Sequence, residues 1–573
     1  MAKKTARSTA GRTSDGRPPG RQLARLVKLT QAFEGGAEKR ALVEALAEAR
    51  LGSAEQVVAF HDALLVLRAR PDDRPLLAAV ERALEGFGAR EDVARFAERL
   101  ADSGLAGTPL HFPWHYRTAS WLAARWGTAL RIDWSRSEPP EDLGQLLAPL
   151  FPYAEIPDLE ALGLTPAELL ARAAGPGETD ATFLLGRLAR LEAPPLLVET
   201  LHDRLGLCYR LEPTSGSPSF TQAALGASRV MPKRQVVWQR HAPRRGRPDL
   251  AAALKEPPVS VEAARGRLAE LHIDRAREAM ATRARELDGI LYASPEDVRV
   301  IDAGDGLWLS CIGLLPAYRA LVETIYVFVL FHNGVPIGYF QAALLFDSAE
   351  VNFNVFPPHR GTEAAFLYAR SLAVVHHLFG VDSFAVEPYQ LGEGNDEALE
   401  SGAYWFYAKL GFQPKAARGK RLRSAEERRL AADPKHRSSR AVLEALARDP
   451  LFFHLGRARD DVAGLVPLSR FSLVVTEELR EAGVDREGGL RQAVVEARRR
   501  LGSRRALDED EARALERWSP LLAALPGLER WPAADRRAVL DVVAAKGGRR
   551  EEVFAAGLRD HRRLRRAVLG LVT

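Results

Sequence analysis

The chain has 573 residues, of which 46% are hydrophobic and 27% are charged. This length exceeds what one hydrophobic core organises, so the sequence predicts several folded domains. The composition excludes a fibrous or largely disordered protein. No stretch is apolar enough over a sufficient length to cross a membrane, and the first 30 residues lack the apolar core of a secretory signal. We therefore expect a cytoplasmic protein without a membrane partner.

The net charge of +6 is concentrated at the N-terminus. The first 25 residues hold seven Lys or Arg and one Asp, a net +6 that equals the excess of the whole chain. We expect a basic disordered tail at residues 1–21, able to make weak contacts with polyanions at low salt. The two cysteines, Cys208 and Cys311, form neither a disulfide framework nor a zinc-binding pattern, and no metal site is predicted.

Residues 22–255 are predicted to form a helical region of one or two subdomains. Apolar residues recur at helical spacing, and Gly52 and Gly86 lie where helices would end. Residues 233–247 carry six cations and no acid.

The pattern changes in residues 256–414, where a helix over 261–288 is expected to precede strand-like runs. The dipeptide Asn333-Gly334 joins two apolar runs and favours a hairpin, and a second turn is expected at residues 347–348. In the next run, "AEVNFNVF", strict alternation separates two faces. One face has Val351, Phe353 and Val355, and the other has Glu350, Asn352 and Asn354.

A mostly apolar helix is predicted over residues 363–379, ending at Gly380, and the strand "DSFAVEP" follows it. Strand, helix and strand in this order predict a right-handed crossover to a parallel neighbour. Residues 415–440, with ten cations and three acids, are predicted to be a basic connector, and residues 441–573 a second helical region. The expected fold is thus multidomain, with mostly α-helical N- and C-terminal regions flanking a central α/β domain.

One part of the central domain has a specific pattern. It runs from "EVNFNVFPPHRGTEAAFLYARSLAVVHHLFGVDSFAVEP" to "SGAYWFYAKLGFQP". It resembles the GNAT superfamily of acyl-CoA-dependent N-acyltransferases, which carry a strand, an R-G-rich turn, a helix, a splayed parallel strand and a last helix ending in "FY-x-K-L-G-F". Residues 406–412 reproduce that last pattern in full.

The resemblance implies direct transfer of an acyl group, most simply acetyl, from a CoA thioester to an amine, without metal. Tyr407 takes the family role of protonating the leaving thiolate, and Glu350 is the candidate base for the acceptor ammonium. Asn352 and Asn354 are expected to contact the acceptor, which would be a protein or another amine. The residues expected to bind acyl-CoA, through strand backbone and the turn before the helix, are Val355, Phe356, Arg360, Gly361, Thr362, Ala364 and Ala365.

The turn departs from the family pattern R-G-x-G-x-G/A, because Glu363 replaces the second glycine. A carboxylate near a pyrophosphate costs about 1–3 kcal/mol at an effective dielectric near 20, unless it points away or pairs with a cation such as Arg370. Two alternatives therefore remain open. One is a catalytically inactive GNAT-like scaffold or binding protein, and the other is a nucleic-acid-associated protein that uses its basic segments.

Overall fold

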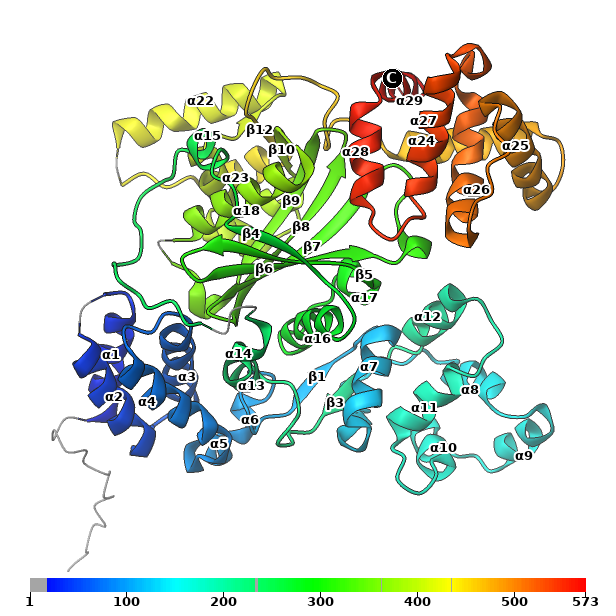
Figure 1. The fold of residues 1–573 in the computed structure, drawn as a ribbon. Coiled ribbons are helices and arrows are strands. Elements are labelled where there is room, and N and C mark those ends of the chain that lie inside the picture. The colour runs from blue at the N-terminus through cyan, green and yellow to red at the C-terminus, as the bar shows by residue number, and fades with distance from the viewer. Residues whose placement is uncertain (1–17, 34, 232–234, 362, 434, 573) are drawn as a thin grey trace, which may run out of the picture. The chain divides into compact units, whose positions relative to one another are not determined.

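The computed structural model describes residues 18–33, 35–231, 235–361, 363–433 and 435–572. They form a mixed α/β protein of two compact units (Figure 1). The first unit comprises the residues up to Pro243 with Leu271–Leu291 and His332–Pro336. The second comprises Arg244–Glu270, Tyr292–Phe331 and the residues from Ile337 onward. The two units interleave in sequence, so the predicted boundary at residue 256 does not separate them.

The first unit is mainly helical, as predicted. Ser53 and Asp73 begin α3 and α4 by accepting hydrogen bonds from the N–H groups of Gln56 and Leu76. The helix α1 already begins at Pro19, inside the predicted tail, and residues 1–17 lie outside the described residues. The helices are α1 (Pro19–Thr30), α2 (Gly36–Glu48), α3 (Ala54–Ala69), α4 (Arg74–Glu85), α5 (Glu91–Arg95), α6 (Ala97–Leu100), α7 (Tyr116–Trp126), α8 (Leu143–Leu147), α9 (Ile156–Ala161), α10 (Pro166–Ala173), α11 (Asp180–Leu188), α12 (Pro195–Arg204), α13 (Phe220–Leu225), α14 (Ala227–Val230) and α17 (Asp288–Leu291).

A small antiparallel sheet in this unit was not predicted. Its strands β1 (Leu110–Phe112), β2 (Leu130–Ile132) and β3 (Tyr209–Leu211) lie in the order β1-β3-β2. Strands of three residues are too short to show a period of two in the sequence.

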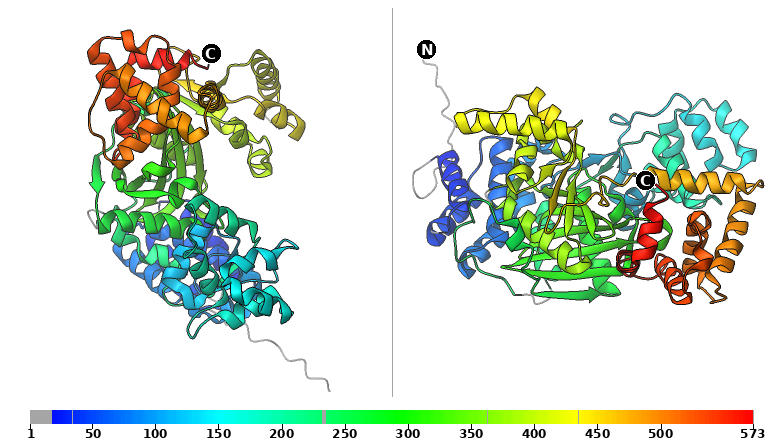
Figure 2. Two further views of the ribbon diagram at one scale, coloured as in Figure 1. Left: turned by 90° about the vertical axis from the view of Figure 1, so that its right-hand side faces the viewer. Right: turned by 90° about the horizontal axis from the view of Figure 1, so that it is seen from above.

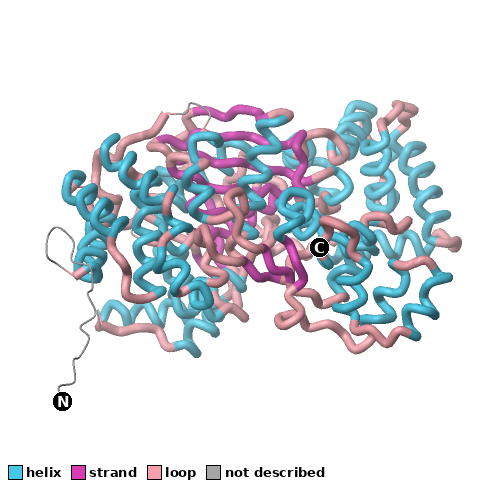
Figure 3. The backbone as a smooth tube through the Cα atoms, turned by 90° about the horizontal axis from the view of Figure 1, so that it is seen from below, coloured by secondary structure: helices cyan, strands magenta, loops and turns pink. Residues whose placement is uncertain are grey.

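The second unit is built on a mostly antiparallel sheet, which has nine strands among the described residues (Figure 3). Their order is β11-β12-β10-β9-β8-β7-β6-β5-β4. The strands are β4 (Ser260–Ala264), β5 (Ala293–Gly304), β6 (Leu307–Leu314), β7 (Thr324–His332), β8 (Val335–Leu345), β9 (Ser348–Val355), β10 (Ser383–Val386), β11 (Gln413–Pro414) and β12 (Leu451–His454).

The turns between these strands follow the sequence closely. Asn333 and Gly334 both have positive φ, 47° and 80°, as a type I′ hairpin turn requires, so this prediction is confirmed. The next turn lies one residue earlier than predicted: Phe346 has φ 57°, and Ser348 already belongs to β9.

The helix predicted over residues 261–288 is wrong in its first part. Residues Ser260–Ala264 form the edge strand β4, in which Val261 lies opposite Ile301 of β5. Gly266, with φ 52°, separates this strand from α16 (Arg267–Ala281). Pairing with β5 therefore outweighs the helical preference of the sequence "VEAA".

The predicted parallel pairing across the crossover helix is confirmed. The helix α18 (Ala364–Phe379) ends at Gly380, which has the left-handed φ of 68°. The next strand, β10, pairs in parallel with β9, with Ser383 opposite Ser348. Beyond it lie α19 (Pro388–Leu391), α20 (Asp396–Ser401) and α21 (Ala403–Lys409).

The basic connector predicted at residues 415–440 is largely helical, and the sheet does not end at residue 414. The segment forms α22 (Ala417–Ala432), whose buried Arg423 donates to the carbonyls of Phe412 and Ala408. After α23 (Arg440–Ala447), the strand β12 enters the sheet between β10 and β11. Residues on both sides of the predicted boundary thus form one sheet.

The helical C-terminal region is present as predicted (Figure 2). Asp508 begins α26 with a capping box to Glu511, which matches the predicted acidic helix start. The core of this bundle includes Trp518 and Phe554, and Leu345 at the end of β8 packs into it. The helices are α24 (Ser469–Glu481), α25 (Arg486–Leu501), α26 (Glu509–Ala524), α27 (Ala533–Ala545), α28 (Glu552–Asp560) and α29 (Arg562–Leu569), and α15 (Leu250–Ala253) lies nearer the start of this unit. No helix of the described residues is long and apolar enough to cross a membrane.

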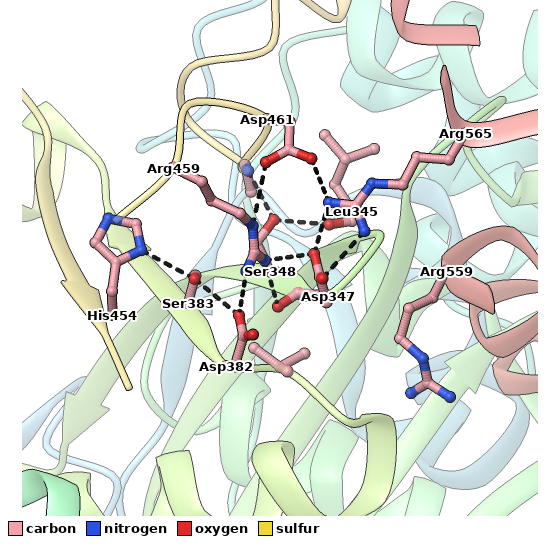
Figure 4. A network of polar contacts seen from close by, with 12 residues as sticks. Leu345, Asp347, Ser348, Asp382, Ser383, His454, Arg459, Asp461, Arg559 and Arg565 are labelled. Carbon is pink, nitrogen blue, oxygen red and sulfur yellow. Dashed lines mark hydrogen bonds and ion pairs between the residues drawn. The ribbon is translucent and has the colours of Figure 1, made fainter. Parts of the chain in front are cut away.

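A network of ion pairs fastens this bundle to the sheet (Figure 4). Asp347, in the turn between β8 and β9, accepts from Arg565 of α29 at 2.9 and 3.0 Å and also from Arg459. Arg459 pairs with Asp382 at 2.7 Å and with Asp461 at 3.1 Å. Asp347 is therefore shared by two arginines that lie far apart in the sequence.

Replacing Asp347 with alanine is expected to lower the free energy of unfolding of the second unit by about 1–3 kcal/mol, because two partly buried guanidinium groups lose a shared carboxylate. The matched control is Asp460→Ala, which removes an exposed carboxylate that pairs with Lys415. It should leave the denaturant midpoint unchanged. Equal shifts of the midpoint in the two variants would contradict a fastening role for Asp347.

Candidate active site

The parallel strands β9 and β10 pair over a short distance and then diverge. Within the described part of the chain, their pairing ends at Glu350 and Ala385, whereas β9 continues to Val355. The N–H of Phe356 donates to Ile337 of β8 at 2.9 Å, which fixes the alternation of the backbone groups along β9. The backbone groups of Val351, Phe353 and Val355 consequently face away from β8, toward the widening gap.

Glu350 lies on β9 at the point where the pairing stops. Burial, followed by the negative charges of Glu387 and Glu323, raises the pKa of its carboxyl group from 4.5 to about 7. A carboxyl group with such a pKa exchanges protons readily near neutral pH, as a general base must. Glu350 thus lies at the start of the gap, in the strand where the sequence predicted it.

Glu387, directly after β10, is a site residue that the sequence interpretation missed. It accepts a hydrogen bond from Asn352, and burial raises the pKa of its carboxyl group. The oxygen Oδ1 of Asn352 is buried without a hydrogen-bond partner among the described residues. A carboxylate at the carboxyl end of a parallel strand was the available sequence signal. Asn354, further along β9, lies opposite Tyr339.

Tyr407 of α21 lies on the aromatic side of the same gap. Its side chain is 4% exposed, and its ring centroid is 5.4 Å from that of Tyr368. Burial, with a smaller contribution from Glu387, raises the pKa of Tyr407, so its hydroxyl group stays protonated at neutral pH. The hydroxyl of Tyr368 is buried with no partner in the part of the chain that the structure describes. Its ring packs on Phe353 of β9 at 5.1 Å.

The turn before α18 is held by side chains as well as by its backbone. Arg360 donates from Nε to the carbonyl of Val355 at 2.8 Å and pairs with Glu397 at 2.7 Å. The N–H of Ala364 donates to Gly361, whereas Ala365 lies in the first helical turn, where N–H groups lack intrahelical acceptors. Thr362 lies outside the described residues.

Two sets of contacts bear on the residues expected in this turn. The N–H of Phe356 donates to the carbonyl of Ile337, and the carbonyl of Phe356 accepts from the N–H of His359. Glu363 accepts from the N–H of Arg244 at 2.8 Å. The cation suggested as its partner, Arg370, instead donates to the carbonyls of Ala303, Glu256 and Pro257.

The structure thus brings together Glu350, Asn352 and Tyr407 around Glu387, where strand pairing ends. Among the described residues there is no group of three or more His, Cys, Asp or Glu arranged to hold a metal ion. No family model matches the sequence, and no curated protein or solved structure matches the chain. The site must therefore be interpreted from its own geometry.

The raised pKa of Glu350 predicts a specific pH dependence of stability. Because the folded protein holds this proton up to about pH 7 and the unfolded chain releases it near 4.5, the free energy of unfolding should fall by about 3 kcal/mol as pH rises through that window. Denaturant midpoints measured from pH 4 to 8 should fall less steeply for Glu350→Gln. The exposed Glu400→Gln should keep the wild-type dependence, and a Glu350→Gln profile parallel to wild type would refute the raised pKa.

Proposed function

We propose that the chain is a CoA-dependent N-acyltransferase that transfers an acyl group, acetyl in the simplest case, to an amine by direct attack. The observation that supports this proposal is a cluster of buried polar side chains beside the gap between β9 and β10. There, Glu350 has a pKa near 7, and buried polar atoms of Asn352 and Tyr368 lack protein partners among the described residues. Such atoms are rare in folded proteins and favour a ligand site.

The residues of the gap suit an extended thioester substrate. The backbone groups of Val351 and Phe353 are directed into the gap. There they would form hydrogen bonds with a pantetheine arm, which would take the place of an added strand. The first turn of α18 carries the positive end of the helix dipole, which favours a pyrophosphate. The Glu363 carboxylate accepts a hydrogen bond from the N–H of Arg244, which lessens the repulsion expected between its charge and the pyrophosphate.

The proton transfers would be shared by two side chains. Glu350 takes a proton from the acceptor ammonium, which frees the nitrogen lone pair to form the new N–C bond. Tyr407, which its raised pKa keeps protonated, donates its hydroxyl proton to the sulfur as the C–S bond breaks. The nitrogen then loses its second excess proton, which returns Tyr407 to its protonated form. No covalent bond to the protein is needed.

A non-catalytic binding role is the second candidate, and one observation favours it. The segment after β12 packs over the face of the sheet that carries Glu350. A side chain at Gly464 would begin 3.3 Å from the Ala385 side chain and 3.7 Å from the Glu350 carboxylate, and Val462 packs with Ala385 and Phe452. A covered carboxylate would not reach an acceptor.

Calorimetric titration of the full-length protein with acetyl-CoA separates these two functions. We expect binding with a Kd on the order of 1–100 μM, and tighter binding by Glu363→Gln because a negative charge near the pyrophosphate is removed. The matched control is Glu400→Gln, which removes an exposed carboxylate outside the turn and should leave the affinity unchanged. Absence of binding in wild type and in Glu363→Gln would rule out the acyltransferase proposal.

Turnover supplies a second test. It is measured as release of the CoA thiol, with lysine-containing peptides and polyamines as acceptors. The rate kcat/KM should rise with pH around an apparent pKa near 7, and Glu350→Gln should lose this rise. Tyr407→Phe should lower kcat by about 10²–10⁴-fold with little effect on acetyl-CoA binding. Full activity of Tyr407→Phe would remove the proposed acid.

A further inference from the structure

A cavity of about 600 Å³ lies in the second unit, between the C-terminal helices and the loop before β7. Its walls come from residues 316–321, which include the short helix η5 (Pro316–Tyr318), and from α24, α25 and α26. The volume falls in the range of small-molecule sites in proteins. It shares no lining residue with the candidate active site.

Part of the cavity lining is apolar. The apolar residues include Leu321, Val475, Leu490, Ala514 and Trp518. Trp518 is held in place because its indole N–H donates to the Leu321 carbonyl at 2.8 Å. A rigid aromatic ring among aliphatic side chains is the kind of wall against which an alkyl chain or ring packs.

The charged side chains around the cavity are mostly cationic. The lining includes Arg319, Arg486, Arg513, Arg517 and Lys546, but only Asp510 and Glu516 as carboxylates. Three of these cations already have carboxylate partners. Arg513 pairs with Glu509 and Asp510, and both Arg319 and Lys546 pair with the buried Glu551.

Arg517 differs from Arg513 in its partners. Its guanidinium group donates to the carbonyls of Ala317 at 2.8 Å and Pro316 at 3.4 Å. These carbonyls orient the group at the cavity wall without cancelling its charge. Burial, and to a lesser extent the charge of Arg513, lowers the pKa of Arg517, while Glu516 and Asp510 act in the opposite direction. Arg486, at the start of α25, is exposed and adds a second cation to the lining.

We propose that this cavity binds a small amphiphile with an apolar body and one anionic group, either a carboxylate or a phosphate. The apolar body packs against Trp518 and Leu490, and the anionic group pairs with Arg517 and Arg486. This site is independent of the proposed acyl transfer and would exist if that activity were absent.

Three ten-carbon probes test the proposal by calorimetry on the full-length protein: decanoate, decyl phosphate and decylamine. At least one of the two anions should bind, and the preferred anion identifies carboxylate or phosphate as the natural group. Decylamine, with the same alkyl chain and opposite charge, should bind at least tenfold more weakly. Arg486→Gln and Arg517→Gln should each weaken binding of the preferred anion by about tenfold, because each removes a charge-assisted contact.

The control is Arg530→Gln, which removes an exposed cation of the same helical region that does not line the cavity. It should bind the anions as wild type does. Because Arg486 is exposed, its variant should fold normally, as the melting temperature will report. Failure of both anions to bind at 1 mM (about the weakest affinity of interest), equal binding of decylamine, or unchanged affinity in both arginine variants would overturn the proposal.

Discussion

The second unit depends on a difference in length between the neighbouring strands β9 and β10. The strand β10 has four residues, Ser383–Val386, all of which pair with β12, whereas β9 runs on to Val355. Because β10 stops early, the far half of β9 has a neighbour on one side, β8, and an open side on the other. Backbone polar groups at such a place need a partner, so, among the described residues, the early end of β10 leaves a gap beside β9 that is open to one. Glu350, Glu387 and Tyr407 all owe their proximity to it.

A second constraint fixes the C-terminal bundle to this sheet. Arg319 donates to the carbonyls of Lys546 and Arg549 at 2.7 and 3.1 Å, and Tyr326 of β7 accepts from the N–H of Glu552 at 2.9 Å. These groups are buried, so their desolvation offsets much of their mutual attraction. Their contribution is to geometry, because these hydrogen bonds hold the loop between α27 and α28 in place against the sheet.

Much of the central fold could be predicted from local signals. Asn333-Gly334 and Gly380 adopt positive φ values that few other residues tolerate, and the alternation in β9 places Glu350 correctly. The errors arose where tertiary contacts override local preference, as in β4, which is helical by propensity but pairs with β5. The high charge of residues 415–440 led to the prediction of a connector. Part of this segment is instead the polar helix α22, which buried Arg423 attaches beside the sheet. Glu387 was missed because its role depends on Asn352, a residue brought beside it only by the crossover.

The insertion of α22 and α23 between β11 and β12 has a consequence for any shortened form of the chain. The strand β12 is separated from β11 by two helices in sequence, yet it is the neighbour that covers the outer side of β10. A fragment that ends at Pro414 would leave Phe384 and Val386 on an apolar edge strand. Uncovered edges of this kind pair with other chains. The smallest fragment that keeps β10 paired on both sides must therefore extend past His454. The length of this folding unit is set by its last strand, β12, and not by the sequence pattern that ends at Pro414.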